Sequence, residues 1–194
     1  AISEFVKLHP DIDIALDLND REVDLVAEGF DLTIRIGVLN DSSLIARKLG
    51  RIRFITAASE EYLALHGTPQ HPSELVRHQG LFYSNISAKQ EWTFMEQGQA
   101  IVAIPHARLR VNNGDFLSKA AIKGLGIVNG PSFLLSRYVR SGQLHTILKD
   151  FRPEETGIFA LFPPGRLIPR RVKVLVEFLQ QQYGDLPEWD KGLV

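Results

Sequence analysis

Cysteine is absent from the 194-residue chain, and methionine occurs only once. Without thiols the protein can form no disulfide, no thiolate zinc site and no cysteine nucleophile, and this composition fits a reducing compartment. The first residues, Ala1 to Phe5, do not form a basic and then apolar signal sequence. We therefore expect a cytoplasmic protein whose chain continues upstream of residue 1.

Long apolar runs and an excess of one charge are also lacking. No apolar run approaches the roughly 18 residues that suggest a membrane-spanning helix. The formal net charge is -1 and the pI is about 6.7, whereas a module that holds DNA by itself usually has a basic excess. The composition predicts no membrane partner and no nucleic-acid binding by this segment alone.

Sequence motifs for catalysis and metal binding are missing as well. There is no GxSxG elbow, no Walker loop and no HExxH, and the six histidines are scattered instead of converging as zinc ligands. Residues 124–130 contain glycines spaced GxGxxxG, but they follow a predicted helix instead of opening one, which favours a helix stop over a dinucleotide loop. We expect no enzyme activity, no metal and no cofactor.

The chain begins with a pattern of helix and then strand. Ile2, Phe5 and Val6 have helical spacing without a preceding cap, so the helix is predicted to begin upstream and to end at His9-Pro10. Apolar residues then alternate with polar ones over residues 12–18, which predicts a strand.

Residues 23–37 organise the first part of the chain. Helical spacing over residues 23–30, capped by Asn19-Asp20 and stopped by Gly29, is followed by strand alternation from Leu32 to Gly37. Residues 38–49 are predicted to be an exposed loop.

Strands and helices alternate along the rest of the chain, which indicates a mostly parallel α/β architecture. The turn-rich stretch at residues 67–80 suggests two lobes. The predicted strands are 52–58, 81–83, 92–95, 100–104, 109–111, 125–128, 144–148 and 157–162, and the predicted helices are 59–66, 116–123, 132–141 and 169–183.

Small polar residues stand at the carboxyl ends of the predicted strands, where ligands bind in α/β sheets. They are Asn19, Ser84, Asn85, Asn112, Asn113 and Asn129. For each residue alone, the preference of Asn and Ser for turns is the better explanation. Arg35 stands between Ile34 and Ile36, so its guanidinium is expected to be partly desolvated and to need an anionic partner, either a ligand carboxylate or a protein aspartate.

Several stretches together resemble the effector-binding domain of LysR-type transcriptional regulators. The most specific is VDLVAEGFDLTIRIG at residues 23–37, followed by SSLIARKL at 42–49. The resemblance continues in HPDI at 9–12, AASEEYL at 57–63, GTP at 67–69, GLGI at 124–127 and GQL at 142–144, and it covers nearly the whole chain.

The resemblance implies a type II periplasmic-binding-protein-like α/β fold, in which two crossover segments join two lobes. Lobe one would be residues 1–55 plus 158–194, and lobe two residues 56–157. The DNA-binding helix-turn-helix, the linker helix and the first strand of the family would precede this segment. A small-molecule effector, which Arg35 suggests is anionic, would bind in the interlobe cleft and modulate promoter binding.

The effector residues implied by this pattern combine the strand-end set with apolar neighbours. They are Arg35, Ile36, Gly37, Ser84, Asn85, Ile86, Asn112, Asn113, Asn129 and Pro131. The family commonly has a small apolar residue where this chain has Asn129, so the amide indicates either a more polar effector or a cap for the next helix.

The resemblance also implies partners. A homodimer or homotetramer would form through the helices at residues 2–8 and 116–123, where we expect Phe5, Ala120 and Ala121 to be exposed, and DNA would be bound only through the missing domain. The main alternative is a free solute-binding protein of the same fold. An enzyme on this scaffold is disfavoured, because the strand-end set contains no paired acid and base.

Overall fold

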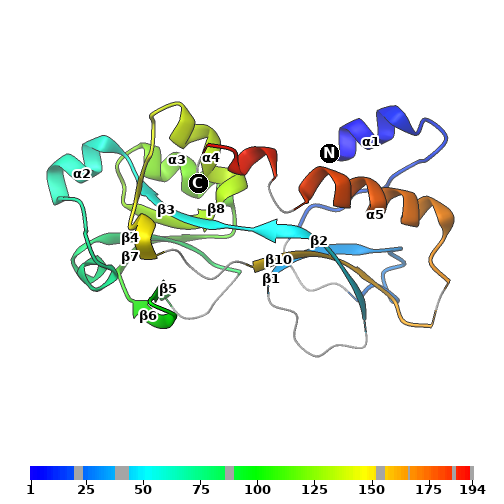
Figure 1. The fold of residues 1–194 in the computed structure, drawn as a ribbon, viewed down its shortest axis with the longest axis horizontal. Coiled ribbons are helices and arrows are strands. Elements are labelled where there is room, and N and C mark those ends of the chain that lie inside the picture. The colour runs from blue at the N-terminus through cyan, green and yellow to red at the C-terminus, as the bar shows by residue number, and fades with distance from the viewer. Residues whose placement is uncertain are drawn as a thin grey trace. The chain divides into compact units, whose positions relative to one another are not determined.

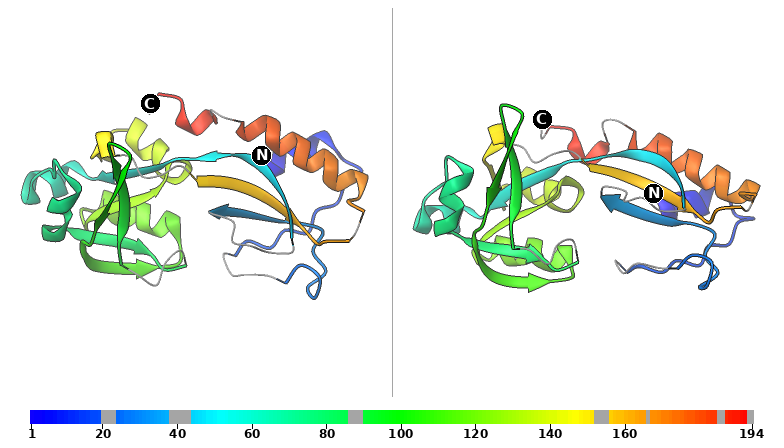
Figure 2. Two further views of the ribbon diagram at one scale, coloured as in Figure 1. Left: turned by 60° about the horizontal axis from the view of Figure 1, so that its bottom comes forward. Right: turned by 90° about the horizontal axis from the view of Figure 1, so that it is seen from below.

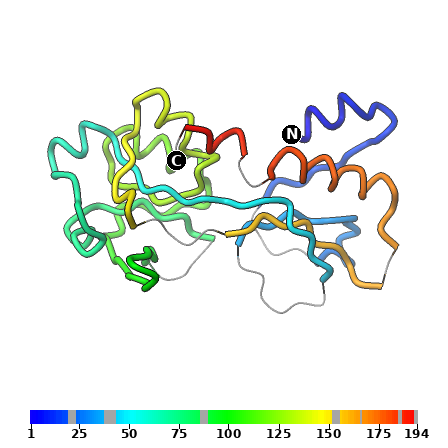
Figure 3. Tube along the Cα trace, viewed as in Figure 1, coloured from blue at the N-terminus to red at the C-terminus, as the bar shows by residue number. Residues whose placement is uncertain are grey.

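The computed structural model describes residues 1–19, 24–37, 44–85, 90–151, 156–165, 167–184 and 187–192. The chain forms two compact units. Unit 1 comprises residues 1–52 and 156–191, and unit 2 comprises residues 53–155 and 192–194. The chain leaves unit 1 after β2 and returns to it at β10 (Figures 1 and 3).

Unit 1 contains an antiparallel sheet in the order β1-β10-β2. These strands are β1 (Thr33–Gly37), β10 (Thr156–Phe162) and β2 (Ile45–Ile52). Helix α5 (Arg170–Tyr183) buries Val172, Val176 and Leu179. Gly50 permits the close approach of this helix to β2, because a Cβ atom there would lie 2.9 Å from the carbonyl oxygen of Gly184.

Helix α1 (Ile2–Leu8) belongs to the same layer as α5. The ring of Phe5 packs edge-on against Phe178 of α5, with 5.4 Å between the ring centroids. Figure 2 shows both helices on one side of the unit 1 sheet. The covered side of the sheet thus depends on segments from both ends of the chain.

Unit 2 contains a mixed sheet in the order β7-β4-β8-β3-β9. Strand β4 pairs in parallel with β7 and β8, whereas β3 pairs antiparallel with β8 and β9. The carboxyl ends of β4, β7 and β8 therefore lie along the same edge of the sheet. The strands are β3 (Phe54–Ala58), β4 (Gln79–Tyr83), β7 (His106–Val111), β8 (Ile127–Pro131) and β9 (His145–Ile147).

Two hydrophobic clusters hold the remaining elements of unit 2 against this sheet. One contains Tyr62, Leu75, Phe82 and Phe94, and the other contains Leu81, Leu117 and Leu135 among their buried residues. The elements are α2 (Glu60–His66), η1 (Pro72–Arg77), β5 (Trp92–Glu96), β6 (Gln99–Ala103), α3 (Gly114–Ile122), α4 (Ser132–Arg140) and η2 (Lys149–Phe151). A further short helix, η3 (Glu188–Asp190), belongs to unit 1.

The predicted strand at residues 12–18 is wrong. These residues have no regular secondary structure, and no described strand pairs with them. Leu16 and Leu18 are 57% and 84% exposed. Alternation makes a segment suitable for a sheet, but only a neighbouring strand supplies its hydrogen bonds.

In the described part of the predicted helix at residues 23–30, residues 25–29 form turns instead of a helix. The carboxylate of Asp24 accepts hydrogen bonds from the backbone N–H groups of Val26 and Ala27, both at 3.0 Å. Gly29 ends the turn with a φ of 74°, as predicted. Asp24 takes the capping place assigned to Asn19-Asp20, of which Asp20 lies outside the described residues.

Two further expectations are corrected. Residues 45–49 form part of β2 instead of a loop, because they pair with β10. Their charged residues interrupt the apolar pattern that would have predicted this strand. The architecture is not mostly parallel, since only the β4–β7 and β4–β8 pairs are parallel among the described strands. The predicted positions of α2, α3, α4 and α5 agree with the structure to within a few residues.

Candidate functional site

The structure brings four of the predicted polar residues together at one edge of the unit 2 sheet. Ser84 and Asn85 follow β4, and Asn112 and Asn113 follow the neighbouring strand β7. The backbone N–H of Ser84 donates a hydrogen bond to the carbonyl oxygen of Val111 at 3.1 Å. This bond continues the parallel pairing past the end of the strand and holds the two loops side by side.

Two of these side chains have hydrogen-bonding groups available to a ligand. The Ser84 hydroxyl donates to the Asn85 amide oxygen at 3.3 Å, which leaves the Asn85 NH₂ group without a further partner among the described residues. Asn112 is exposed, and its side chain has no partner within the described ranges. Asn85 and Asn112 therefore offer neighbouring amide groups at the strand ends.

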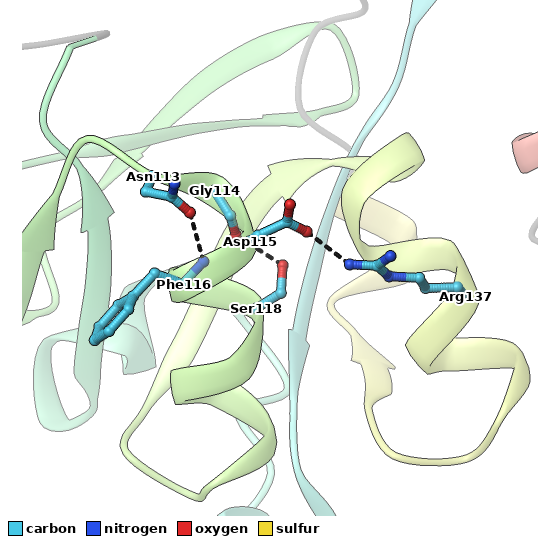
Figure 4. A network of polar contacts seen from close by, with 6 residues as sticks. All are labelled: Asn113, Gly114, Asp115, Phe116, Ser118 and Arg137. Atoms are coloured by element: carbon cyan, nitrogen blue, oxygen red, sulfur yellow. Dashed lines mark hydrogen bonds and ion pairs between the residues drawn. The ribbon is translucent and has the colours of Figure 1, made fainter. Parts of the chain in front are cut away.

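Asn113 has a structural role. Its side-chain oxygen accepts a hydrogen bond from the backbone N–H of Phe116 at 2.8 Å, which caps α3 (Figure 4). The same close-up shows Asp115 of α3 joined to Arg137 of α4 at 2.6 Å. Asn113 thus sets the start of a helix that is fixed to its neighbour by an exposed ion pair.

Asn129 lies inside β8 and not at the end of the strand. Its amide NH₂ donates to the hydroxyl oxygen of Thr56 on β3 at 2.9 Å, and the two residues face each other in the ladder. The alternative that Asn129 caps the next helix is wrong, because α4 begins after Pro131 without any side-chain cap. Pro131 is half-buried at the end of β8.

Arg35 lies in unit 1, in the middle of β1. Arg35 is half-buried, whereas Ile34 and Ile36 are 37% and 42% exposed, so the isoleucines form the more exposed face of this strand. Gly37 ends the strand with a φ of 141°. Ile86, the remaining predicted effector residue, lies outside the described residues.

A buried polar cluster in unit 2 has no counterpart in the sequence analysis. The Tyr62 hydroxyl accepts a hydrogen bond from the backbone N–H of Gln79 at 2.9 Å and lies 3.3 Å from Nδ1 of His78. Burial lowers the pKa of His78, nearby His66 lowers it further, and Glu74 opposes the shift. Burial also raises the pKa of Tyr62, against the effect of the Gln79 hydrogen bond.

Unit 1 also has a small cavity of about 200 Å³, and none of the predicted site residues is part of its lining. Its lining is Phe30, Asp31, Phe162, Pro163, Leu167, Ile168 and Pro169. Within the described ranges, no group of three or more His, Cys, Asp or Glu side chains could hold a metal ion. No described helix is long and apolar enough to span a bilayer.

The chain matches one family model over residues 1–184, that of the LysR substrate binding domain. The chain belongs to this family. An HTH-type transcriptional regulator of Haemophilus influenzae is 36% identical to this LysR domain over 168 residues, which cover 87% of the domain and 58% of the relative. The regulator PtxR of Pseudomonas aeruginosa is 31% identical over 183 residues, covering 94% of the domain and 59% of PtxR.

Solved structures agree with this membership. The regulatory domain of CrgA from Neisseria meningitidis has a TM-score of 0.82 at 28% identity, covering 94% of this LysR domain and 90% of that chain. Full-length AphB of Vibrio cholerae has a TM-score of 0.79 at 29% identity, covering 93% and 61%. The fold is therefore the type II periplasmic-binding-protein-like fold of LysR regulatory domains, as the resemblance implied.

The LysR domain spans about three fifths of the length of the curated relatives it matches. Those relatives are named as transcriptional regulators and not as enzymes. The family membership decides against the alternative of a free solute-binding protein.

The structure also corrects an expectation about the LysR domain's helices. Phe5, Ala120 and Ala121, which were expected to be exposed, are 0%, 5% and 0% exposed. These side chains pack inside their own units instead of facing solvent.

Proposed function

We propose that this LysR domain senses a small molecule for a cytoplasmic, DNA-binding transcription regulator. The regulator names of the relatives support this proposal, as does their greater length, which leaves room for a helix-turn-helix module. Binding of an effector would change the population of the regulator's conformations and thereby its action at a promoter. Effector binding in this domain requires no catalytic group.

The observation that carries the proposal is the pair of available amides at the carboxyl edge of the unit 2 sheet. Asn85 and Asn112 extend from the ends of two neighbouring parallel strands, and the Ser84–Val111 hydrogen bond keeps those ends together. Amide groups can both donate and accept, so this edge suits hydroxyl, carbonyl or carboxylate groups of a ligand.

Binding of an anionic group of the effector by Arg35 to Gly37 remains a separate prediction. The half-buried position of Arg35 supports it, because a partly desolvated guanidinium favours a carboxylate partner. The predicted lobes, residues 1–55 plus 158–194 and residues 56–157, likewise stay a proposal, and the nearby bounds of units 1 and 2 support it.

Self-association through α1 and α3 is the partner proposal. The exposed apolar residues on these helices support it in place of the buried ones first named. Val6 and Leu8 on α1 are 41% and 59% exposed, and Phe116 on α3 is 53% exposed.

Calorimetry with a library of small carboxylates and neutral polyols tests the sensing proposal. For a ligand that binds the wild type, the Asn85→Ala/Asn112→Ala variant should bind about tenfold or more weakly, since each lost hydrogen bond contributes about 1 kcal/mol. Gln99→Ala, an exposed amide on β6, is the matched control and should bind normally. Unchanged affinity in the double variant would assign the ligand to another surface.

A further inference from the structure

The cavity of unit 1 lies where the chain passes from the sheet to helix α5. Its lining comes from the last residue of β10, from the connection between β10 and α5, and from Phe30 and Asp31 shortly before β1. Thr33 faces Leu161 in the ladder, so the start of β1 lies beside the end of β10. Residues that are distant in sequence therefore line the same cavity.

The walls of this cavity are largely apolar. Two phenylalanines, Leu167 and Ile168 supply hydrocarbon side chains, and the two prolines have no backbone N–H group to offer. An apolar cavity of about 150 Å³ is large enough to hold benzene. The volume of about 200 Å³ here therefore suits a branched aliphatic side chain. Leu167 is 97% exposed although it lines the cavity, so an occupant would bury apolar surface that otherwise stays in water.

A pair of opposite charges stands at the same place. Among the described lining residues, Asp31 alone carries a charge. Its Oδ2 accepts a hydrogen bond from Nη2 of Arg171 at 3.4 Å. Both side chains are more than half exposed, and an ion pair in that setting contributes little to folding stability. A ligand can therefore replace this ion pair without a large loss of folding free energy.

We infer that this cavity binds a branched aliphatic amino acid as the free zwitterion. The ammonium group pairs with Asp31, the carboxylate pairs with Arg171, and the aliphatic side chain fills the cavity. One ligand then gives each member of the exposed ion pair a new partner of opposite charge. The site lies within unit 1 and shares no residue with the strand-end amides, so it goes beyond the sensing site of the proposed function.

Two simpler classes of ligand fit less well. A plain amine would pair with Asp31 but would leave the guanidinium of Arg171 without its carboxylate. A plain carboxylate would pair with Arg171 but would leave Asp31 unpaired beside the bound anion. Either ligand breaks the ion pair and replaces only half of it, whereas the zwitterion replaces both halves.

Calorimetry with L-leucine, isoamylamine and isocaproate tests the inference. Isoamylamine is leucine without its carboxylate, and isocaproate is leucine without its ammonium group, so all three ligands carry the same isobutyl group. We expect leucine to bind the wild type with a dissociation constant of about 1 mM or lower. It should bind about tenfold more tightly than either analogue, because each analogue lacks one charged contact.

Substitution of one charge should change the ligand preference in a defined direction. Asp31→Asn removes the partner of the ammonium group and frees Arg171, so isocaproate should bind more tightly than to the wild type and should match leucine. Arg171→Gln frees Asp31, so isoamylamine should gain affinity and should match leucine in turn. An ion pair with a structural role alone would produce neither change of preference.

The apolar part of the site is tested in the same way. Leu167→Ala should weaken the binding of all three ligands by about threefold to tenfold, because it removes apolar surface from the lining. The matched control is Leu65→Ala on α2, where the leucine is 78% exposed, and it should leave binding unchanged. Asp115→Asn/Arg137→Gln removes an exposed ion pair of unit 2 and should also leave leucine binding unchanged. Circular dichroism checks that each variant is folded.

Four results would overturn the inference. One is the absence of leucine binding at about 10 mM, which is tenfold above the expected dissociation constant. Equal or tighter binding of isoamylamine to the wild type would favour a cationic ligand, and the same result with isocaproate would favour an anionic one. The fourth is loss of leucine binding in the Asn85→Ala/Asn112→Ala variant, which would assign leucine to unit 2. Since the sensing proposal depends on that double variant and this inference on Asp31 and Arg171, the two can fail separately.

Discussion

His78 is 5% exposed and links three segments of unit 2 through its imidazole and its backbone carbonyl group. Its Nδ1 faces the Tyr62 hydroxyl of α2, and its carbonyl oxygen accepts the backbone N–H of His106, which opens β7. Because Tyr62 already accepts a hydrogen bond from Gln79, its own proton is available for a neutral His78. Protonation of Nδ1 removes that acceptor, so the folded state favours the neutral ring.

Stability should accordingly depend on pH. Burial lowers the folded pKa of His78 below the ordinary value of 6.5, so the unfolded chain binds this proton more readily. The stabilisation of the folded state by neutral His78 is complete above about pH 6.5. It is lost as the pH falls from there towards the folded pKa, by at most about 1.4 kcal/mol per pH unit.

Urea unfolding of the wild type and of His78→Asn between pH 5 and pH 8 measures this effect. Asn places an amide near the position of Nδ1 but does not titrate, so the variant should lose most of the decrease between pH 6.5 and pH 5. His145→Asn replaces an exposed histidine of β9 and should keep the decrease. Parallel curves for the wild type and His78→Asn would show that another group is responsible.

Residues with local partners were the predictable ones. The sequence predicted a helix over residues 59–66, which Ser59 caps by accepting the N–H of Tyr62, and a helix stop at Gly124, whose φ is 71°. The Tyr62–His78 contact joins residues 16 positions apart on different elements, and no local pattern encodes it. Among the candidate site residues, the neighbouring ends of β4 and β7 were predictable, whereas the Asn129–Thr56 bond depends on a strand register.

At the scale of an element, α3 shows how one side chain can be assigned either to a ligand or to the fold. Asn113 was predicted to bind the effector, and its oxygen caps the helix instead of remaining available. Replacement of an N-cap Asn by Ala typically costs about 0.5–2 kcal/mol of folding free energy. We expect Asn113→Ala to lower the free energy of unfolding by that amount.

The comparison of two neighbouring asparagines makes this prediction specific. Asn113→Ser keeps a capping oxygen and should retain near wild-type stability in urea unfolding. Asn112→Ala should leave stability within about 0.5 kcal/mol of the wild type, because an exposed side chain without a described partner contributes little. Equal losses for Asn112→Ala and Asn113→Ala would contradict the assignment of the cap.

Other elements show where sequence patterns are insufficient. The alternation of residues 12–18 and the helical spacing of residues 23–30 are both genuine, but neither segment forms the regular element in its described part. Each pattern indicates which face of the segment could be buried. Whether that face is buried depends on the neighbouring elements that pack against it. Strand β2 illustrates the converse, because pairing with β10 makes a strand of IARKLGRI despite its charges.

At the scale of the whole molecule, unit 2 is built almost entirely from one continuous stretch of the chain, whereas unit 1 combines two stretches that are far apart in sequence. Both hydrophobic clusters of unit 2 consist of residues between Ile55 and Phe151. We expect a fragment of residues 53–155 to fold alone and to unfold cooperatively in urea, with circular dichroism typical of a mixed α/β protein. A fragment of residues 1–52 should remain unfolded, because among the described strands β1 and β2 are joined only through β10.

Titration of the unit 2 fragment with the effector library gives the companion measurement. Retained weak binding that is sensitive to Asn112→Ala would support the strand-end amides as a self-contained part of the site. An unfolded or non-cooperative fragment would show that unit 2 needs unit 1 for stability, and would contradict this prediction.

The place of β10 in the middle of the unit 1 sheet has a consequence for synthesis on the ribosome. Residues 1–52 emerge before β10, and this strand, which joins β1 to β2, follows about a hundred residues later. At about 5–20 residues per second, residues 1–52 wait roughly 5 to 20 seconds for it. During that interval unit 2 can complete its fold, while the exposed apolar side chains of the waiting segment are available to molecular chaperones.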